Sequence, residues 1–361
     1  MDLTGKPLSG RVVALVPAHN EESSIAGTIE SVLAQQRVPD VIVIICDNCT
    51  DNTQAVASQY PVTVVATVNN SKKKVGAMNW AWAEFAQDAD TVICLDADTT
   101  LPPNAVSDWA QELADDPRLG GSSSRFTMLG GQFLVRLQRA EFFRWSESSL
   151  RRGWTSVLAG TGCAIRGSVL RELAARDDRT GPWTSGSLVE DFELTYQVRR
   201  MGYKCHVSPT VPAYTDAMRT VRSLWAQRMK WQVGTASDLL AFGFNRLTRL
   251  DWVQQAAGLL SALTRALWIL SLVLAVALGA FRLHPIWFAI PVFFVGIDVI
   301  YALRVPGRDK MDILIAASLF PQEFFSWMRA AWFTVSWVEV LAGKITGRHK
   351  DRWSLQYSAE K

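Results

Sequence analysis

Short β-branched runs alternate with helix-like segments over the first hundred residues, and this alternation constrains the fold more than any other feature. The almost wholly apolar runs are residues 11–17, 41–46, 62–68 and 91–95. Such continuous apolarity is typical of parallel strands that are buried on both faces of a sheet. The helical patterns between them are residues 23–35, 50–59 and 75–87. The chain is therefore expected to fold as an α/β sheet wound by right-handed crossovers.

Acidic residues follow two of these predicted strands. Asp96 and Asp98, in the stretch VICLDADTTLPP, come directly after the run 91–95, and Asp47 follows the run 41–46. In open α/β sheets ligands bind beyond the carboxyl ends of the strands. Paired carboxylates there suit Mg²⁺ or Mn²⁺ bridging a substrate diphosphate, with water completing the octahedron. A lone D-x-D is also typical of a solvated loop, so the choice between a metal site and a loop depends on the neighbouring residues.

Polar residues near the same expected edge favour a ligand site. Residues 20–22 (NEE) end the first strand in a turn that suits hydrogen bonds to a base or a ribose. Lys74 precedes a predicted helix, and a positive charge beside a helix N-terminus attracts anions. The preceding lysines, residues 72–73, are interpreted as an exposed charged turn.

Two later segments add candidate site residues. The stretch LAGTGCAIRGSVL contains Gly160, Thr161 and Gly162, a turn that lets backbone approach a ligand closely. Glu190 and Asp191 lie at the start of a helix predicted over residues 190–201. A carboxylate at that position can serve as a general base. The alternative is that these acids complement the helix dipole and do nothing more.

The segment TVRSLWAQRMKWQVG combines cations with aromatic rings. It holds Gln227, Arg228, Lys230 and Trp231. Cations beside a diphosphate and an indole for stacking a sugar both fit this composition. An amphipathic helix lying against a membrane is the competing interpretation.

In this order, the motifs resemble those of the family 2 glycosyltransferases, inverting enzymes of the GT-A fold. The closest likeness is to the membrane-bound branch with cellulose, hyaluronan and poly-N-acetylglucosamine synthases. VPAHNEE resembles the family's P-x-x-N-E, KKKVGAMN its G-K-x-x-A-L-N, LDADT its D-x-D and VEDFELTYQVRRMGYK its E-D motif. QRMKW stands where the branch has Q-x-x-R-W. The resemblance covers about residues 11–235.

The resemblance implies a GT-A fold with a Rossmann-like mixed sheet, a nucleotide-sugar donor (a UDP-sugar) and Mg²⁺ or Mn²⁺. Asp98 would ligate the metal, and Asp96 would support the nucleotide or its ribose. Asp191 would be the base that deprotonates the acceptor hydroxyl. The residues expected to bind the donor nucleotide are Pro17, Ala18, Asn20, Glu21, Asp47, Lys74 and Asp96. Those expected near the diphosphate or the acceptor are Gly160, Thr161, Gly162, Glu190, Gln227, Arg228, Lys230 and Trp231.

Two departures from the branch leave alternatives open. Lys230 replaces the usual arginine, giving a point charge in place of a bidentate fork. In addition, about two membrane crossings are visible, whereas pore-forming synthases usually have more. We expect transfer of one sugar or a few; the alternatives are a processive polysaccharide synthase and a catalytically degenerate nucleotide-sugar-binding scaffold. A dehydrogenase is disfavoured because no G-x-G-x-x-G follows the first strand.

The composition shifts after residue 240, which predicts two parts. Residues 1–240 would form the cytoplasmic catalytic domain, ending in an interfacial helix at about 219–240. Residues 241–361 would hold a transmembrane hairpin at about 256–303, an amphipathic helix at about 311–343 and a basic cytoplasmic tail. Asp298 in the second apolar stretch is expected to make a local polar contact within the hairpin or an oligomer. A buried core helix pair is the alternative to the hairpin.

The distribution of charge and the number of cysteines indicate where the protein is located and which partners it binds. The basic residues that flank the hairpin place both of its ends in the cytoplasm, and they are Arg246, Arg249, Arg304, Arg308 and Lys310. The start MDLTGKPLSGR lacks a long apolar core, so no signal peptide is expected. A net charge of +3 does not argue for nucleic acid, and five cysteines read as reduced thiols. The acceptor could be a glycan, a lipid-linked sugar, a glycolipid or a protein, and a homo-oligomer is possible.

Overall fold

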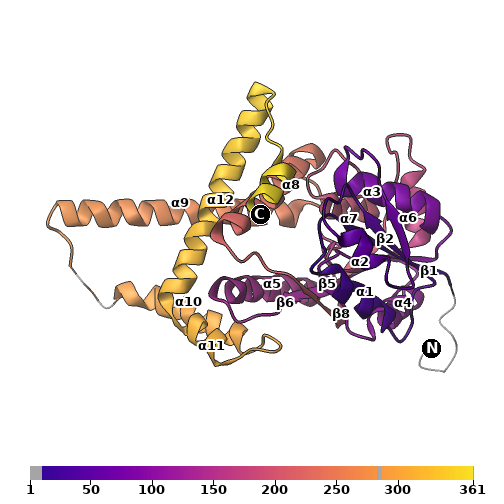
Figure 1. The fold of residues 1–361 in the computed structure, drawn as a ribbon. Coiled ribbons are helices and arrows are strands. Elements are labelled where there is room, and N and C mark those ends of the chain that lie inside the picture. The colour runs from indigo at the N-terminus through magenta and orange to yellow at the C-terminus, as the bar shows by residue number, and fades with distance from the viewer. Residues whose placement is uncertain (1–9, 283, 285, 361) are drawn as a thin grey trace. The chain divides into compact units, whose positions relative to one another are not determined.

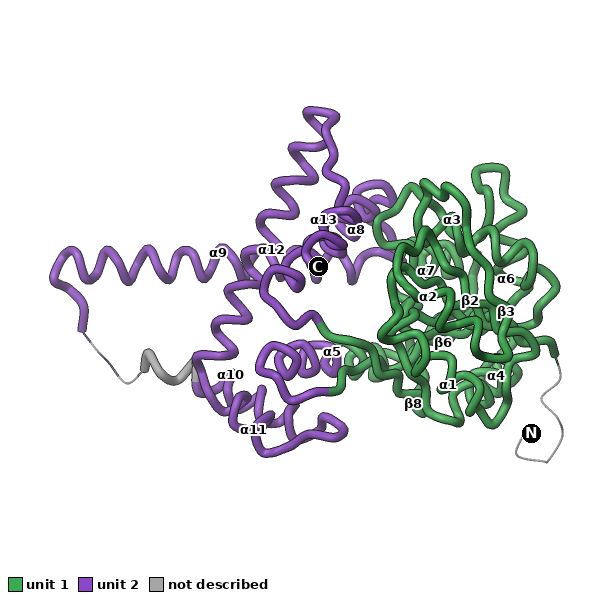
Figure 2. Tube along the Cα trace, viewed as in Figure 1, with its two compact units in different colours: residues 1–129, 145–217 green, residues 130–144, 218–361 purple. Residues whose placement is uncertain are grey.

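The structure is a computed structural model that describes residues 10–282, 284 and 286–360. Figure 1 labels its strands and helices. The chain forms two compact units, which Figure 2 colours: residues 1–129 with 145–217, and residues 130–144 with 218–361. Helix α8 (Val221–Phe242) thus belongs with the C-terminal helices, whereas composition placed the division after residue 240. The expected absence of a signal peptide concerns residues 1–9, which lie outside the described residues.

Four parallel strands form one half of the sheet in the first unit. They are β1 (Val12–Ala18), β2 (Val41–Cys46), β3 (Thr63–Ala66) and β4 (Thr91–Cys94). Their spatial order is β3-β2-β1-β4, with Ala18 opposite Cys46 at the carboxyl end. The α/β prediction from residues 11–95 is therefore confirmed.

The other half of the sheet makes it mixed. Strand β7 (Cys163–Arg166) runs antiparallel to β4, and the order continues through β6 (Leu119–Met128) and β8 (Lys204–Thr215) to β5 (Thr99–Thr100). This Rossmann-like mixed sheet agrees with the expected architecture. Because β1, β2 and β4 are parallel, their carboxyl ends lie at one edge of the sheet.

Helices cover both faces of the sheet because each strand sends alternate side chains to opposite sides. On β1, Val12, Ala14 and Val16 join one apolar cluster, and Val13 and Leu15 join the other. The first cluster includes residues of α1 (Ile25–Leu33), α2 (Thr53–Ala57) and α4 (Ala105–Asp115). The second includes residues of α3 (Lys73–Ala81), the π-helical turn η1 (Trp82–Ala86), α6 (Gly167–Ala174) and α7 (Glu190–Arg200).

The second unit is helical. Its helices besides α8 are α9 (Arg249–Ala277), α10 (Ile286–Ala302), α11 (Lys310–Ala317), α12 (Leu319–Thr346) and α13 (Arg352–Glu360). The N-terminal part of α5 (Phe133–Arg152) belongs to this unit and the rest to the first. Helix α12 packs against α8 and α9, and α13 packs against α8.

Helix α9 is the membrane candidate. Among the described residues it is the one helix whose length and composition suit a membrane crossing, and its apolar stretch is not covered by protein. The second apolar helix of the expected hairpin has a shorter described apolar stretch, Val292–Ala302, and residues 283 and 285 of the turn lie outside the described residues. The segment expected as one amphipathic helix at 311–343 is two helices, because Ser318 interrupts it with an extended backbone.

Ion pairs between arginines of α5 and aspartates of the C-terminal helices tie the second unit together. Arg136 lies 2.5 Å from Asp309 and 3.0 Å from Asp312. Arg144 pairs with Asp298 of α10. The expected polar contact of Asp298 is thus made to a helix outside the hairpin. The hydrogen bonds from Arg136 hold the pKa of Asp309, which begins α11, well below its usual range.

Candidate functional site

The loop after β2 holds a buried aspartate. Asp47 continues the pairing of β2 with β1, because its backbone N–H donates to the carbonyl of Ala18 at 2.8 Å. Its Oδ1 accepts hydrogen bonds from Thr67 Oγ1 at 2.6 Å and Asn70 Nδ2 at 2.8 Å. These donors fix the carboxylate at the carboxyl edge of the sheet, where the sequence placed it.

The turn after β1 is fixed by the loop after β2. Asn20 adopts a left-handed backbone with φ 59°, which asparagine tolerates better than most residues, and its Oδ1 accepts from the Thr50 N–H at 2.7 Å. The Glu21 N–H donates to Thr53 Oγ1 at 2.7 Å, and the Glu21 carbonyl accepts from the first residue of α1. Pro17 and Ala18 end β1 just before this turn. The donor-binding residues predicted on the first two strands therefore share one edge.

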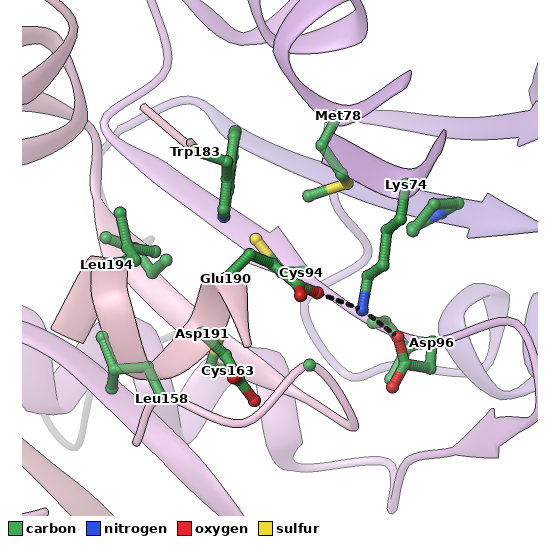
Figure 3. Close-up of a pocket in the computed structure, with 14 residues that line it drawn as sticks. Lys74, Met78, Cys94, Asp96, Leu158, Cys163, Trp183, Glu190, Asp191 and Leu194 are labelled. Carbon is green, nitrogen blue, oxygen red and sulfur yellow. Dashed lines mark hydrogen bonds and ion pairs between the residues drawn. The ribbon is translucent and has the colours of Figure 1, made fainter. Parts of the chain in front are cut away.

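Lys74 joins three parts of the chain at this edge. From the start of α3 its ammonium reaches Asp96 Oδ1 at 2.7 Å and Glu190 Oε1 at 3.0 Å (Figure 3). Burial opposes the charge on Lys74, but the charges of Asp96 and Glu190 outweigh this and raise the pKa of Lys74 well above its usual range. The ammonium therefore stays protonated while it neutralises part of an acidic cluster.

Asp191 lies on the same side of the sheet, in the first turn of α7. It lines one cavity with Lys74, Asp96 and Glu190. Burial and the charge of Glu190 raise the pKa of Asp191 to about 6, although Lys74 opposes this. A carboxylate with a raised pKa in a cavity is a better proton acceptor than one in water. The structure thus brings the predicted base beside the predicted donor residues.

Asp98 stands in an excess of negative charge. Burial raises the pKa of Asp98 to about 7, together with the charges of Asp96, Glu21 and Asp216. Its Oδ1 accepts from Thr99 Oγ1 at 3.1 Å and Thr215 Oγ1 at 3.2 Å. Crowded carboxylate oxygens of this kind fit a hard divalent cation. Among the described residues no group of three or more His, Cys, Asp or Glu is arranged to hold a metal, so a bound cation would take further ligands from substrate or water.

The glycine turn lies against the acidic cluster. The carbonyl of Gly160 accepts from the Asp96 N–H at 2.9 Å. A Cβ at residue 160 would come within 2.8 Å of Lys74 Nζ, so glycine leaves the cavity open there. Thr161 Oγ1 is buried without a hydrogen-bond partner in the described part of the chain, and Gly162 has φ 143°. Gly160 thus lies against Lys74 and Asp96, and the close approach of this turn to a ligand stays a prediction.

Apolar side chains complete the cavity. Beneath the charged residues its lining comes from both halves of the sheet and from α3 and α7, and it includes Met78, Cys94, Leu158, Cys163, Trp183 and Leu194 (Figure 3). All five cysteines of the chain are free thiols. The cavity thus combines carboxylates and one ammonium with apolar side chains, a lining that suits charge stabilisation.

The residues predicted in QRMKW lie on α8, in the second unit. Arg228 is buried and donates to Glu141 at 3.0 Å, and its guanidinium also reaches Gln227 Oε1 at 2.8 Å. The Arg228 guanidinium carbon lies 4.5 Å from the ring centre of Trp231. Lys230 is buried, with its ammonium 3.3 Å from the ring centre of Trp353 in α13. Their expected roles at a diphosphate or an acceptor remain predictions.

Several residues of the site carry no motif that sequence reasoning used. Trp183, eight residues before Asp191, lines the cavity, and Asn79 of α3 holds its backbone. Thr215 ends β8 and donates a hydrogen bond to Asp98, and the charge of Asp216, the next residue, helps to raise the pKa of Asp98. Only the mixed half of the sheet brings β8 to this edge. For Trp183, the aromatic residue in the turn-rich PWTSG just before the E-D motif was the available signal.

An α/β sheet with acidic residues at its carboxyl edge and a general-base candidate in a cavity is an arrangement that suits the binding of a charged ligand and group transfer. Residues 13–174 match the model of Glycosyl transferase family 2. This segment of the chain is therefore similar to the glycosyl transferase family 2 domain.

Two curated relatives agree with this family. The chain is 28% identical over 247 residues to the probable glycosyltransferase YdaM of Bacillus subtilis, covering 64% of this chain and 57% of the relative. It is 25% identical over 252 residues to the poly-beta-1,6-N-acetyl-D-glucosamine synthase of Staphylococcus aureus, covering 68% of this chain and 59% of the relative. The match thus spans less than two thirds of either relative.

One solved structure shares the fold over nearly the whole chain. The mannosyltransferase PcManGT from Pyrobaculum calidifontis, in complex with GDP-Man and Mn²⁺, superposes with a TM-score of 0.60. The two sequences are 18% identical, and the match covers 94% of this chain and 91% of that one. The likeness confirms the GT-A fold.

Proposed function

We propose that the protein is a membrane-attached, metal-dependent inverting glycosyltransferase that moves a sugar from a UDP-sugar to an acceptor hydroxyl. The observation that carries this proposal is the cluster of Lys74, Asp96, Glu190 and Asp191 in one cavity of a glycosyl transferase family 2 domain. It combines a base with a cation and a D-x-D at the edge where α/β sheets bind nucleotides.

In this proposal Asp191 accepts the proton of the acceptor hydroxyl as that oxygen attacks the anomeric carbon. The attack comes from the face opposite the leaving UDP, so the configuration inverts. The raised pKa of Asp191, about 6, suits this task because the carboxylate is still ionised near neutral pH. Lys74 holds Asp96 and Glu190 in place beside it.

Asp98, supported by Thr99 and Thr215, is the proposed ligand of Mg²⁺ or Mn²⁺. When bound, the cation would stabilise the negative charge that develops on the leaving diphosphate. Asp47, Asn20 and Glu21 are the proposed contacts of the nucleoside, because hydrogen bonds hold the side chains of Asp47 and Asn20 and the backbone of Glu21 at the same edge of the sheet.

Membrane attachment rests on α9, which has an 18-residue apolar stretch that protein does not bury. Arg246 and Arg249 at its start and the basic residues near Lys344 in α12 suit the cytoplasmic side of a bilayer. The catalytic unit would then face the cytoplasm. The acceptor would be a glycan, a lipid-linked sugar, a glycolipid or a protein presented at the membrane surface.

A second candidate function is processive synthesis of a polysaccharide. The likeness to the poly-beta-1,6-N-acetyl-D-glucosamine synthase favours it. The two functions differ in their products, since a processive enzyme releases long chains while donor is still in excess. Product length, read by mass spectrometry after partial conversion, separates them.

The test is nucleotide release by the purified full chain from a panel of UDP-, GDP- and dTDP-sugars with Mn²⁺, with Mg²⁺ or with EDTA. We expect release from one class of donor, loss of release in EDTA and loss in the Asp98→Ala variant. The lysine of the neighbouring exposed turn supplies the control, because Lys72→Ala should release nucleotide at the wild-type rate. Nucleotide release that continues in EDTA would contradict metal dependence. If the protein also binds no nucleotide, the enzyme assignment is wrong and the degenerate-scaffold alternative remains.

A further inference from the structure

The segment between α6 and α7, residues 175–189, leads directly into the turn that carries Asp191, and α3 holds it at one point. Asn79 Nδ2 donates to the carbonyl of Trp183 at 2.7 Å, and the Trp183 N–H donates back to Asn79 Oδ1 at 3.0 Å. A single planar amide thus satisfies both backbone groups of Trp183. A Cβ at residue 181 would lie 2.5 Å from Asn79 Oδ1, so Gly181 is needed for this close approach.

A buried arginine holds the same segment to α7. Arg179 donates to both carboxylate oxygens of Glu193, Nη1 to Oε1 at 2.9 Å and Nη2 to Oε2 at 3.0 Å. Its guanidinium also reaches the carbonyl of Pro182 at 2.5 Å and the carbonyl of Gly181 at 3.3 Å. The side chains of Arg179 and Glu193 are 5% and 7% exposed, so this fork is shielded from water and salt.

The two attachments connect the helices that carry the site. Asn79 lies in α3, whose first turn carries Lys74, and Glu193 lies in α7, two residues after Asp191. Gln197 also donates to Glu193 at 2.9 Å, so the Glu193 carboxylate has partners on α7 as well as on the segment. Arg179 therefore fixes the first turn of α7 relative to the wall that Trp183 forms in the cavity.

We propose that Arg179 is a positioning residue for the transfer reaction: its fork on Glu193 and on the carbonyls of Gly181 and Pro182 keeps Asp191 in the cavity beside Glu190 and Lys74. The inference rests on the proposed role of Asp191 as base. Arg179 does not line the cavity, so it acts through the geometry of α7. A lysine there would keep the charge but lose the fork that bonds both oxygens of Glu193.

The pH dependence of the reaction reports this role. The charged groups that act on Asp191 are Glu190 on its own helix, Lys74 on α3 and Asp96 after β4. The charge of Asp191 in turn helps to raise the pKa of the Cys163 thiol on β7. Burial is the largest cause of the raised pKa of Asp191. If α7 loses its attachment, water reaches the carboxylate and the pKa falls toward its ordinary value. The acid limb of the pH profile of kcat/KM then moves to lower pH.

The experiment measures nucleotide release from UDP-N-acetylglucosamine, or from the panel donor that the wild-type chain turns over fastest, between pH 5 and 8. The variants are Arg179→Gln, Arg179→Lys and Glu193→Gln. The control is Arg151→Gln, which breaks an exposed pair with Glu147 on α5. For Arg179→Gln we expect kcat/KM to fall about 10- to 100-fold and the acid limb to move down by about one pH unit, with UDP affinity retained. Arg179→Lys should recover part of the rate.

An unchanged acid limb in both Arg179→Gln and Glu193→Gln would overturn the inference, even if turnover fell in proportion to stability. If Arg179→Gln does not fold, Glu193→Gln decides, because it keeps the volume and a hydrogen-bond acceptor at residue 193. Asp191→Asn is run in parallel. If that variant turns over at the wild-type rate, the base assignment and the inference fall together; if it is inactive while the Arg179 variants match wild type, only the inference falls.

Discussion

Lys74 and Asp96 form an ion pair of 2.7 Å at the edge of the sheet where β1, β2 and β4 end. The same ammonium lies 3.0 Å from Glu190, the residue beside the proposed base. One cation therefore links the D-x-D to the start of α7. Without it, Asp96, Glu190 and Asp191 would face one another with no compensating charge among them.

Replacing Lys74 by methionine should lower kcat/KM by about 10- to 100-fold, since bonds to charged groups contribute about 1.5–3 kcal/mol each. It should also move the acid limb of the pH profile to higher pH. Lys74 lowers the pKa of Asp191, so its removal raises that pKa. The profile of nucleotide release against pH measures both effects. Lys72→Met is the matched control, and a limb that moves to lower pH would contradict the electrostatic role.

For the wild-type enzyme, kcat/KM should rise with pH through about 6 and then level off. Burial and Glu190 raise the pKa of Asp191 to that value, and the base works only when deprotonated. Below this pH the carboxylate gains a proton and the rate falls about tenfold per pH unit. Asp191→Asn should lose about 10²- to 10⁴-fold and show no such limb. A wild-type limb near pH 4, the range of an ordinary aspartate, would rule out this environment for the base.

The positions of Asp47 and Asp96 could be predicted from the sequence, because the carboxyl ends of adjacent parallel strands lie at the same edge of a sheet. Once residues 11–17, 41–46 and 91–95 are taken as adjacent parallel strands, Asp47 and Asp96 must share an edge, and the structure places them there. Asp191 could be placed only through the family resemblance, since α7 reaches the site from beyond the mixed strands. Its neighbour Glu190 pairs with Lys74, which lies more than a hundred residues earlier in the chain.

Other features had no local signal. Asn79 and Trp183 meet through hydrogen bonds between residues 104 positions apart, and Arg179 reaches Glu193 from 14 positions away. Periodicity in the sequence does not reveal such contacts. In the second unit, composition suggested an interfacial helix at 219–240, but it did not indicate that Arg228 would be buried against Glu141 of α5. Burial of a charged residue depends on its partner, and the partner is set by tertiary packing.

Gly160 should be needed for activity because its missing side chain leaves space in the cavity. A Cβ there would come within 2.8 Å of Lys74 Nζ and 3.3 Å of the Asp96 carboxylate, while the backbone needs no left-handed conformation. Gly160→Ala should therefore fold with a nearly unchanged melting temperature but lose about tenfold or more in kcat/KM. Activity assays and thermal unfolding of the same preparation check this. Gly186→Ala, at an exposed turn, is the control, and equal activities would show that the cavity has room to spare.

Arg228 should act on stability more than on the affinity for donor. It is buried between Glu141 and the rings of Phe142 and Trp231, and Arg329 approaches the other oxygen of Glu141 at 3.2 Å. Removing the sole partner of a buried charge costs about 3–5 kcal/mol, and Arg228→Ala should cost less than this because Arg329 stays beside Glu141. Arg228→Ala should lower the melting temperature of the detergent-solubilised protein by several degrees. A melting temperature equal to that of Arg222→Ala, an exposed change on the same helix, would contradict the structural role and return Arg228 to the list of donor contacts.

Lys230 lies under the ring of Trp353, 3.3 Å from its centre, and the residue is buried. Trp353 belongs to α13, which is held to α12 by the ion pair of Arg352 with Glu339. In the wild-type chain, acetylation of Lys230 by acetic anhydride should therefore be slow. Trp353→Ala removes the cover and a cation–π contact of about 0.5–2 kcal/mol, so acetylation of Lys230 should become several-fold faster. Peptide mass spectrometry measures the rate, and exposed Lys344 on α12 serves as the internal reference. If Lys230 reacts as fast as Lys344 before the substitution, α13 does not cover it in solution, and the ammonium is already accessible to a diphosphate.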